Sequence, residues 1–193
     1  MSLQPHMDSD GLNYFKNRLQ NSQYFLEYGC GGSTVYACNE PHIRKVISVD
    51  TDPSWIEKIK NETLDKSSKL IINHIDLGEV GDWGAPKTTI KFRDFYKYPT
   101  TPWLNAKKLK VVPDTVLIDG RFRVACFLSS LLAARVGTTL IFDDYFDRPQ
   151  YFVAEEFCSI ELKVGRAAVF TKTKQFNIID LTSELCKYTM IWD

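Results

Sequence analysis

Short apolar runs alternate with amphipathic segments through most of this chain. Apolar runs of about four to eight residues bounded by turn residues are typical of buried strands, and apolar residues spaced three and four apart are typical of helices. The expected strands cover residues 24–28, 44–50, 69–75, 114–120 and 138–142. The expected helices cover residues 10–20, 33–39, a segment starting at Pro53, 121–136 and a stretch near 149–158.

Two of these helices carry clear signals. Asp52 is a good N-cap, and Pro53 suits the first helical position because the missing N–H is not needed there. Ile56, Ile59 and Leu64 should share one side of that helix. The helix over 121–136 should bury one apolar face, formed by Val124, Ala125, Leu128, Leu131 and Leu132.

The alternation fails over residues 77–110, which are rich in glycine, proline and aromatic residues. We expect an inserted aromatic loop here, and long loops in compact domains are often functional lids. Trp83 lies between Gly81 and Gly84 and should pack on something. Two interpretations stay open: a small hydrophobic cluster that pins the loop, or the wall of a ligand pocket that includes Trp83.

Near the end of the chain, two apolar runs flank the turn residues Gly165 and Arg166. The runs cover residues 159–164 and 167–171, which predicts a β-hairpin. Strands that alternate with helices indicate an α/β fold with a mostly parallel sheet and helices on both faces. A C-terminal extension is expected over 174–193.

Length and composition narrow the class of protein. A chain of 193 residues with 44% hydrophobic and 25% charged residues suits one α/β domain over 1–193. The 24 basic and 24 acidic residues balance, so nothing indicates attraction to nucleic acid or to an anionic membrane. No apolar run approaches a membrane span of about 20 residues. The five cysteines form no metal-type pair, which indicates reduced thiols and a cytoplasmic location.

The most informative motif follows the first expected strand, where Glu27 is succeeded by Gly29, Gly31 and Ser33. Glycines in such a turn allow unusual dihedrals and a close approach of backbone N–H groups to a nucleotide-like ligand at a helix N-terminus. Asp50 ends the second strand 21 residues after Gly29, close to the spacing of about 20 at which a carboxylate meets ribose hydroxyls. The motif and the acid together predict a nucleotide-type cofactor site.

Five strand–helix units followed by a hairpin, together with this motif, resemble the class I S-adenosylmethionine-dependent methyltransferases, from about residue 20 to residue 173. The resemblance implies a doubly wound seven-stranded sheet that ends with an antiparallel hairpin. It departs from the family at Ser33, which follows Gly32 where a third glycine is usual. An ordinary dinucleotide-binding fold is the main competitor, but Thr34 stands where that motif has its third glycine.

The resemblance also implies roles for acidic residues at strand ends. Glu27 would hold the methionine amino group of S-adenosylmethionine, with Gly29, Gly31 and Ser33 in the turn beside it. Asp50 would accept the ribose hydroxyls, and Asp76 would meet the adenine amine unless it only shapes a turn. Asp119 would lie beside the methyl-transfer centre as base or orienting group, and Tyr145 is a weaker catalytic candidate. The implied cofactor is S-adenosylmethionine.

Charged residues gather at the fourth and fifth strand ends. Arg121 and Arg123 begin a helix, where cations oppose the helix dipole and need a negative partner. Asp143 and Asp144 end the next strand. The arginines could bind an anionic substrate or could pair with Asp119, Asp143 and Asp144. Those three acids could instead bind Mg²⁺, as in the metal-dependent small-molecule O-methyltransferases, but the nearby arginines favour an arrangement without a metal.

The sequence therefore predicts methyl transfer from S-adenosylmethionine to an unidentified small-molecule acceptor. Two other functions stay open, because a fold alone does not establish an activity. The first is a non-catalytic module that binds the cofactor or another protein, and the second is a different nucleotide-using enzyme.

Overall fold

The computed structural model describes residues 3–192 and contains one seven-stranded sheet in the order β3-β2-β1-β4-β5-β7-β6. The first five strands in the chain are parallel, and β7 runs antiparallel to both β5 and β6. The predicted fold class is confirmed. The strands are β1 (Tyr24–Tyr28), β2 (Lys45–Asp50), β3 (Leu70–His74), β4 (Thr115–Ile118), β5 (Thr139–Phe142), β6 (Leu162–Val164) and β7 (Ala167–Thr171).

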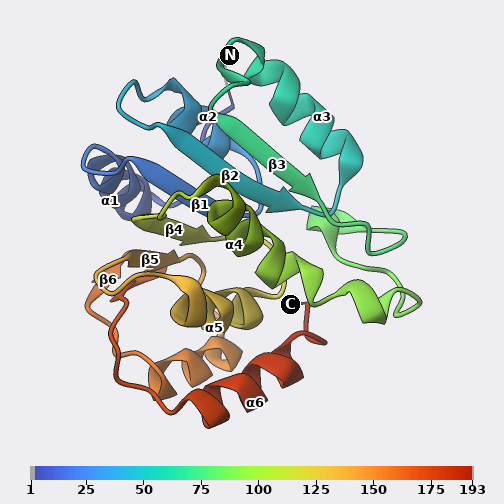
Figure 1. Cartoon of the computed structure of the whole chain (residues 1–193), viewed down its shortest axis with the longest axis vertical. Helices are drawn as coiled ribbons and strands as arrows, with labels where there is room; N and C mark the ends of the chain where they lie inside the picture. Colours follow the sequence, from blue (N-terminus) through green and yellow to red (C-terminus); the bar gives the residue numbers. More distant parts are fainter. Residues whose placement is uncertain (1–2, 193) are drawn as a thin grey trace.

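Helices cover both faces of the sheet (Figure 1). α4 and α5 lie in front of the sheet in that view, α1 and α2 lie behind it, and α6 packs on α5. The α-helices are α1 (Ser9–Leu19), α2 (Gly32–Asn39), α3 (Pro53–Glu62), α4 (Lys97–Leu109), α5 (Arg123–Ala133) and α6 (Ile178–Tyr188). Short 3₁₀ helices cover Leu64–Lys66, Asp82–Gly84, Phe92–Asp94 and Pro149–Glu156.

The larger hydrophobic core lies between the sheet and the layer of α4, α5 and α6. Tyr28, Phe127 and Phe142 are fully buried there. The smaller core on the other face contains Phe15 and Phe25, whose ring centroids are 5.6 Å apart. Central strands of a parallel sheet are covered on both faces, which explains why they are continuous apolar runs in the sequence.

The main error of the sequence prediction concerns residues 77–110. Instead of an uninterrupted loop, the second half of this segment forms α4, which contains Pro102. The helix buries Tyr98, Trp103 and Ala106 against the sheet, and Trp103 Nε1 donates to Tyr28 Oη at 2.8 Å. Packing of an apolar face outweighs the helix-breaking tendency of Pro102 here.

Smaller differences concern helix type and burial. The predicted helix near 149–158 is a 3₁₀ segment over Pro149–Glu156, and the helix predicted from 121 begins at Arg123. Leu132 was expected to be buried, but it is 39% exposed. Leu64 was expected on the helix that begins at Pro53, but α3 ends at Glu62 and Leu64 begins a 3₁₀ segment.

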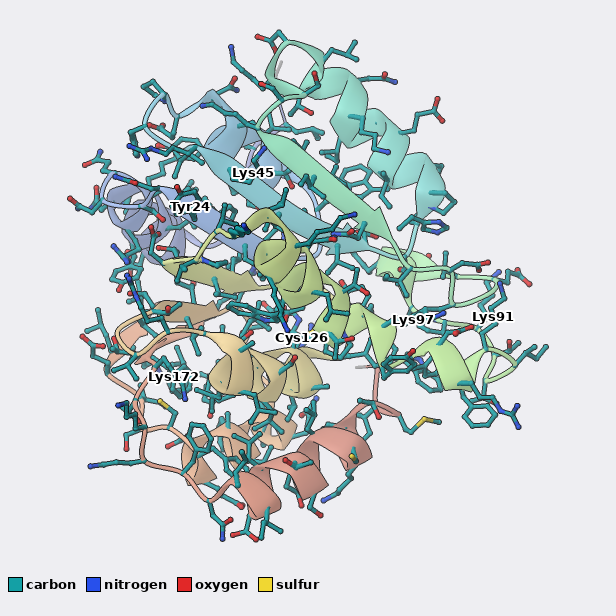
Figure 2. All side chains as sticks on the ribbon, viewed as in Figure 1. Tyr24, Lys45, Lys91, Lys97, Cys126 and Lys172 are labelled. Atoms are coloured by element: carbon teal, nitrogen blue, oxygen red, sulfur yellow. The ribbon has the colours of Figure 1, made fainter. Side chains whose placement is uncertain are left out.

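The segment after β7 includes α6, capped by Asn177 and anchored by the buried Leu181. Residue 193 of the predicted extension lies outside the described residues. Across residues 3–192, none of the helices has the length and apolar character that a membrane crossing requires. Figure 2 shows Cys126 in the interior and Lys91 at the periphery, in the segment after β3.

The turns after β1 and β4 touch each other at the carboxyl edge of the sheet. Gly29 has φ +90°, and a Cβ there would lie 2.8 Å from the Gly120 Cα. A Cβ on Gly120 would lie 2.7 Å from the Gly29 nitrogen and would also clash with Tyr98 Oη. Both positions therefore need glycine, because any side chain would push the two strand ends apart.

We predict that Gly120→Ala lowers the free energy of unfolding by about 1–3 kcal/mol, as overpacking does elsewhere. Gly31→Ala is the matched control, because a Cβ at Gly31 meets no atom within 4 Å. Urea denaturation of both variants measures the difference. Equal stability of the two variants would contradict the inferred contact.

Candidate functional site

A cavity of about 680 Å³ opens at the carboxyl ends of the central strands. Gly29, Asp50, Asp119 and Asp144, each at the end of a different strand, line it together with the N-terminal residues 3–7. From β1 the chain adds β2 and β3 toward one edge of the sheet, and it then returns to add β4 on the other side of β1. Open α/β sheets bind ligands outside the strand ends at such a switch point, so this cavity is the candidate site.

Glu27, in β1, holds the glycine turn in place through hydrogen bonds. This side chain is fully buried; Ser33 Oγ donates to it at 2.7 Å and Thr34 Oγ1 at 2.5 Å. Thr34 Oγ1 in turn accepts from the Gly31 N–H at 2.8 Å. Burial raises the pKa of Glu27 to about 7, against the lowering effect of the two hydroxyls. Glu27 does not line the cavity, so its predicted contact with an amino group stays a prediction.

Asp50, the last residue of β2, lies on the cavity wall, and its contact with ribose hydroxyls stays a prediction. Its carboxylate accepts backbone N–H groups from Thr51 at 2.7 Å, Cys30 at 3.0 Å and Asp52 at 3.1 Å. Burial raises the pKa of Asp50, although these N–H groups lower it. The backbone holds the carboxylate in place at the boundary between the β1 and β2 turns.

Asp76 and Trp83, the two remaining residues predicted to contact a cofactor, have different surroundings. Asp76 pairs with Lys91, accepts the Gly78 N–H at 3.0 Å and does not line the cavity. Trp83 does line it, although 79% of Trp83 is exposed, and its ring lies 6.0 Å from that of His6. Trp83 therefore does not pin the loop through burial, in contrast to one of the two interpretations of this segment.

Three carboxylates and four arginines, Arg121, Arg123, Arg148 and Arg166, form the other half of the site. Acidic oxygens of Asp119, Asp143 and Asp144 lie within 4.8 Å of one another. Arg123 contacts both Asp119 and Asp144 at 3.1 Å. Burial and the charges of Asp143 and Asp144 raise the pKa of Asp119 to about 7, against the lowering effect of Arg123. The predicted pairing with these acids is therefore present for Arg123 but, within residues 3–192, absent for Arg121.

Arg166, at the turn between β6 and β7, was missed by the sequence analysis. It contacts Asp143 at 2.6 Å and Asp144 at 2.9 Å, and its Nη2 donates to the His6 carbonyl at 2.7 Å. The Arg166 N–H also donates to Asp8 at 2.7 Å. Arg166 thus ties the acidic cluster to the N-terminal residues, and its charge is supported by the carboxylates, which raise its pKa.

Tyr145 and Arg148 follow β5 at the same edge of the sheet. Arg148 contacts Asp144 at 3.1 Å and donates to Tyr151 Oη at 2.9 Å. Tyr145 is fully buried, donates to Glu155 at 3.2 Å and does not line the cavity. The geometry gives no support to Tyr145 as a catalytic residue.

The acidic cluster has the oxygen ligands that Mg²⁺ prefers. Each of the three carboxylates, however, already pairs with at least one guanidinium. A divalent cation would compete with these arginines for the same lone pairs. The donor set therefore fits an arginine-neutralised cluster better than a metal site.

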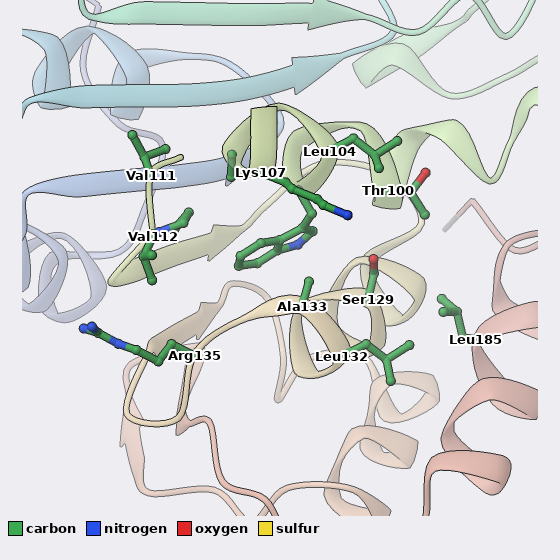
Figure 3. A pocket seen from close by; sticks show the side chains of 13 residues that line it. Thr100, Leu104, Lys107, Val111, Val112, Ser129, Leu132, Ala133, Arg135 and Leu185 are labelled. Carbon is green, nitrogen blue, oxygen red and sulfur yellow. The ribbon is translucent and has the colours of Figure 1, made fainter. Parts of the chain in front are cut away.

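A second hollow of about 510 Å³ lies between α4 and α5, away from the strand ends that carry the acids (Figure 3). Leu104, Val112 and Leu132 give it an apolar lining, with Lys107 and Arg135 among its polar residues. It shares no lining residue with the first cavity.

The sheet order with its antiparallel last strand defines the class I methyltransferase fold. A methyltransferase-like protein from Silicibacter pomeroyi DSS-3 has a crystal structure with a TM-score of 0.87 to this chain, at 31% identity over 98% of each chain. The chain therefore belongs to the methyltransferase-like proteins of the class I S-adenosylmethionine-dependent family.

A more distant structure shares the fold. The N-methyltransferase NodS from Bradyrhizobium japonicum WM9, in complex with S-adenosyl-L-homocysteine, matches with a TM-score of 0.51 and 11% identity, covering 86% of this chain and 90% of that chain. No protein-family model matches the chain, and neither does any curated protein.

The buried Glu27 makes stability depend on pH. A carboxyl whose pKa rises from 4.5 to about 7 on folding favours the protonated folded state, so stability falls as the pH rises through this window. We predict that Glu27→Gln removes up to about 3 kcal/mol of this loss. Urea denaturation at pH 5 and pH 7 measures the free energy of unfolding of the variant and of the wild type. Asp50 and Asp119 contribute equally to the pH dependence of both proteins, so the difference between them reports on Glu27. An unchanged pH dependence would show that Glu27 is ionised in the fold.

Proposed function

We propose that this protein binds S-adenosylmethionine in the cavity at the strand ends and transfers its methyl group to a small-molecule acceptor. The observation that carries the proposal is the glycine turn with Asp50 on the same wall, in a chain that belongs to the methyltransferase-like proteins. The cavity volume of about 680 Å³ lies within the usual range for small-molecule sites.

The residues present fit this cofactor. A Cβ at Gly31 would meet nothing within 4 Å, so the turn leaves open space on the cavity side. Asp50, fixed by three backbone N–H groups, would accept the ribose hydroxyls. Ser33, in the first turn of α2, would bring the cofactor close to a helix N-terminus. Glu27 would act mainly by holding Ser33 and Thr34.

When bound, S-adenosylmethionine supplies an electrophilic methyl group on a sulfonium. The protein must align a nucleophilic atom with that methyl group and exclude water. Asp119 lines the cavity at the end of β4 and would accept the proton from the nucleophile. A pKa near 7 suits a general base at neutral pH, and Arg123 fixes the carboxylate.

We predict that the wild type binds S-adenosylhomocysteine and that Asp50→Ala weakens this binding by about 1.5–3 kcal/mol, the cost of losing hydrogen bonds to a charged group. Asp76→Ala is the matched control, because Asp76 does not line the cavity. Calorimetric titration measures each affinity, with NAD as the competing ligand class. Unchanged affinity in Asp50→Ala, or preference for NAD, would contradict the proposed cofactor site.

We also predict that Asp119→Asn lowers turnover by about 10²–10⁴-fold, as removal of a general base does. Transfer of labelled methyl groups across a metabolite panel first finds an acceptor and separates an enzyme from a non-catalytic module. Activity should then survive EDTA, because the arginines already neutralise the acidic cluster. Loss of activity with EDTA and recovery with Mg²⁺ would instead assign the cluster to a metal.

A further inference from the structure

Arg121 differs from the other arginines of the cavity. Each of Arg123, Arg148 and Arg166 forms an ion pair with at least one carboxylate of the acidic cluster. Within residues 3–192, no carboxylate pairs with the Arg121 guanidinium, and its Nε is buried without a hydrogen-bond partner. Burial and the charge of Arg123 lower the pKa of Arg121. A half-buried cation without a counter-ion costs free energy, and a ligand anion would recover that cost.

The backbone fixes Arg121 at this position. Its N–H donates to Tyr98 Oη at 3.3 Å, and its carbonyl accepts from Cys126 Sγ at 3.3 Å. The next residue, Phe122, is fully buried and has φ +54°, a conformation that costs free energy in a residue other than glycine. These contacts fix the Arg121 backbone at a position from which the residue lines the cavity.

The position of Arg121 also separates it from the proposed cofactor half of the cavity. The groups whose charges act on the pKa of Arg121 are Arg123, Tyr98, Tyr151 and Arg148. Tyr151 and Arg148 belong to the segment after β5, whereas Asp50 ends β2 and the glycine turn follows β1. Tyr98 lies beside the Gly29–Gly120 contact, between the two halves. Arg121 is two residues beyond Asp119, the proposed base. An anion bound at Arg121 would therefore lie on the side of the acceptor.

We propose that the methyl acceptor carries an anionic group, a carboxylate or a phosphate, and that Arg121 binds this group. The inference rests on the proposed function and names the class of its acceptor. A guanidinium presents paired N–H donors that match two oxygens of either anion, so both share one recognition chemistry. The anion would orient the acceptor with its nucleophilic atom toward Asp119.

The test uses the whole protein saturated with S-adenosylhomocysteine. Benzoate, phenyl phosphate and the neutral benzamide serve as probes in calorimetric titrations, and the two anions distinguish a carboxylate from a phosphate site. We expect at least one anion to bind tenfold or more tightly than benzamide. Arg121→Met should abolish this preference and change the affinity for S-adenosylhomocysteine less than twofold.

Two other variants keep the result interpretable. Arg121→Lys should keep part of the preference, because it retains the charge without the paired donors. Arg135→Met, an arginine of the separate hollow between α4 and α5, should behave as wild type. Thermal unfolding verifies that each variant is folded, and Arg121→Lys provides the comparison if Arg121→Met is not.

Several outcomes overturn the inference. An anion preference that survives in both Arg121 variants excludes Arg121 as the binding group. A loss of S-adenosylhomocysteine affinity in Arg121→Met, larger than the loss of anion binding, would show that Arg121 binds the cofactor carboxylate. Wild type that binds no S-adenosylhomocysteine defeats the proposed function itself, whereas cofactor binding without an anion preference defeats only this inference.

Discussion

The backbone contact between Gly29 and Gly120 is the constraint on which the site depends. It brings the turns after β1 and β4 together where the strand order reverses. The glycine turn and Asp50 lie on one side of this contact, and Asp119 lies on the other. A ligand bound on the first side would therefore lie next to the acids on the second. The contact requires glycine at position 29, because any other residue would be strained at its positive φ.

The same edge stabilises buried acids in two different ways. Glu27 is satisfied by two neutral hydroxyls, and burial brings its pKa to about 7. Asp143 is satisfied by the guanidinium of Arg166, at 2.6 Å. Neutral hydroxyls satisfy the Glu27 carboxyl without adding charge, whereas a guanidinium places an opposite charge beside the Asp143 carboxyl. The glycine turn is thus held by hydroxyl hydrogen bonds, and the acidic cluster by ion pairs.

Much of this arrangement could be predicted from the sequence, because strand ends in a parallel sheet share one edge. The glycine turn, Asp50 and the acids after β4 and β5 follow from apolar runs that end in polar residues. Arg166 could not be found this way, because its place depends on the register of β7, in which Ala168 pairs with Phe142. That register sets the tip of the hairpin beside Asp143. α4 was missed for another reason: its helical state depends on burying Tyr98 and Trp103, which local propensity does not reveal.

The N-terminal wall of the cavity depends on long-range contacts of this kind. A Cβ on Gly32 would collide with the backbone of Gln4, so the absence of a side chain lets the N-terminal residues lie directly on the glycine turn. Arg166 holds the same residues through the His6 carbonyl and the carboxylate of Asp8. Because Arg166 also pairs with Asp143 and Asp144, one guanidinium connects the acidic cluster with the N-terminal segment that lines the cavity. The position of this segment at the cavity wall is therefore coupled to the ion pairs beside Asp119.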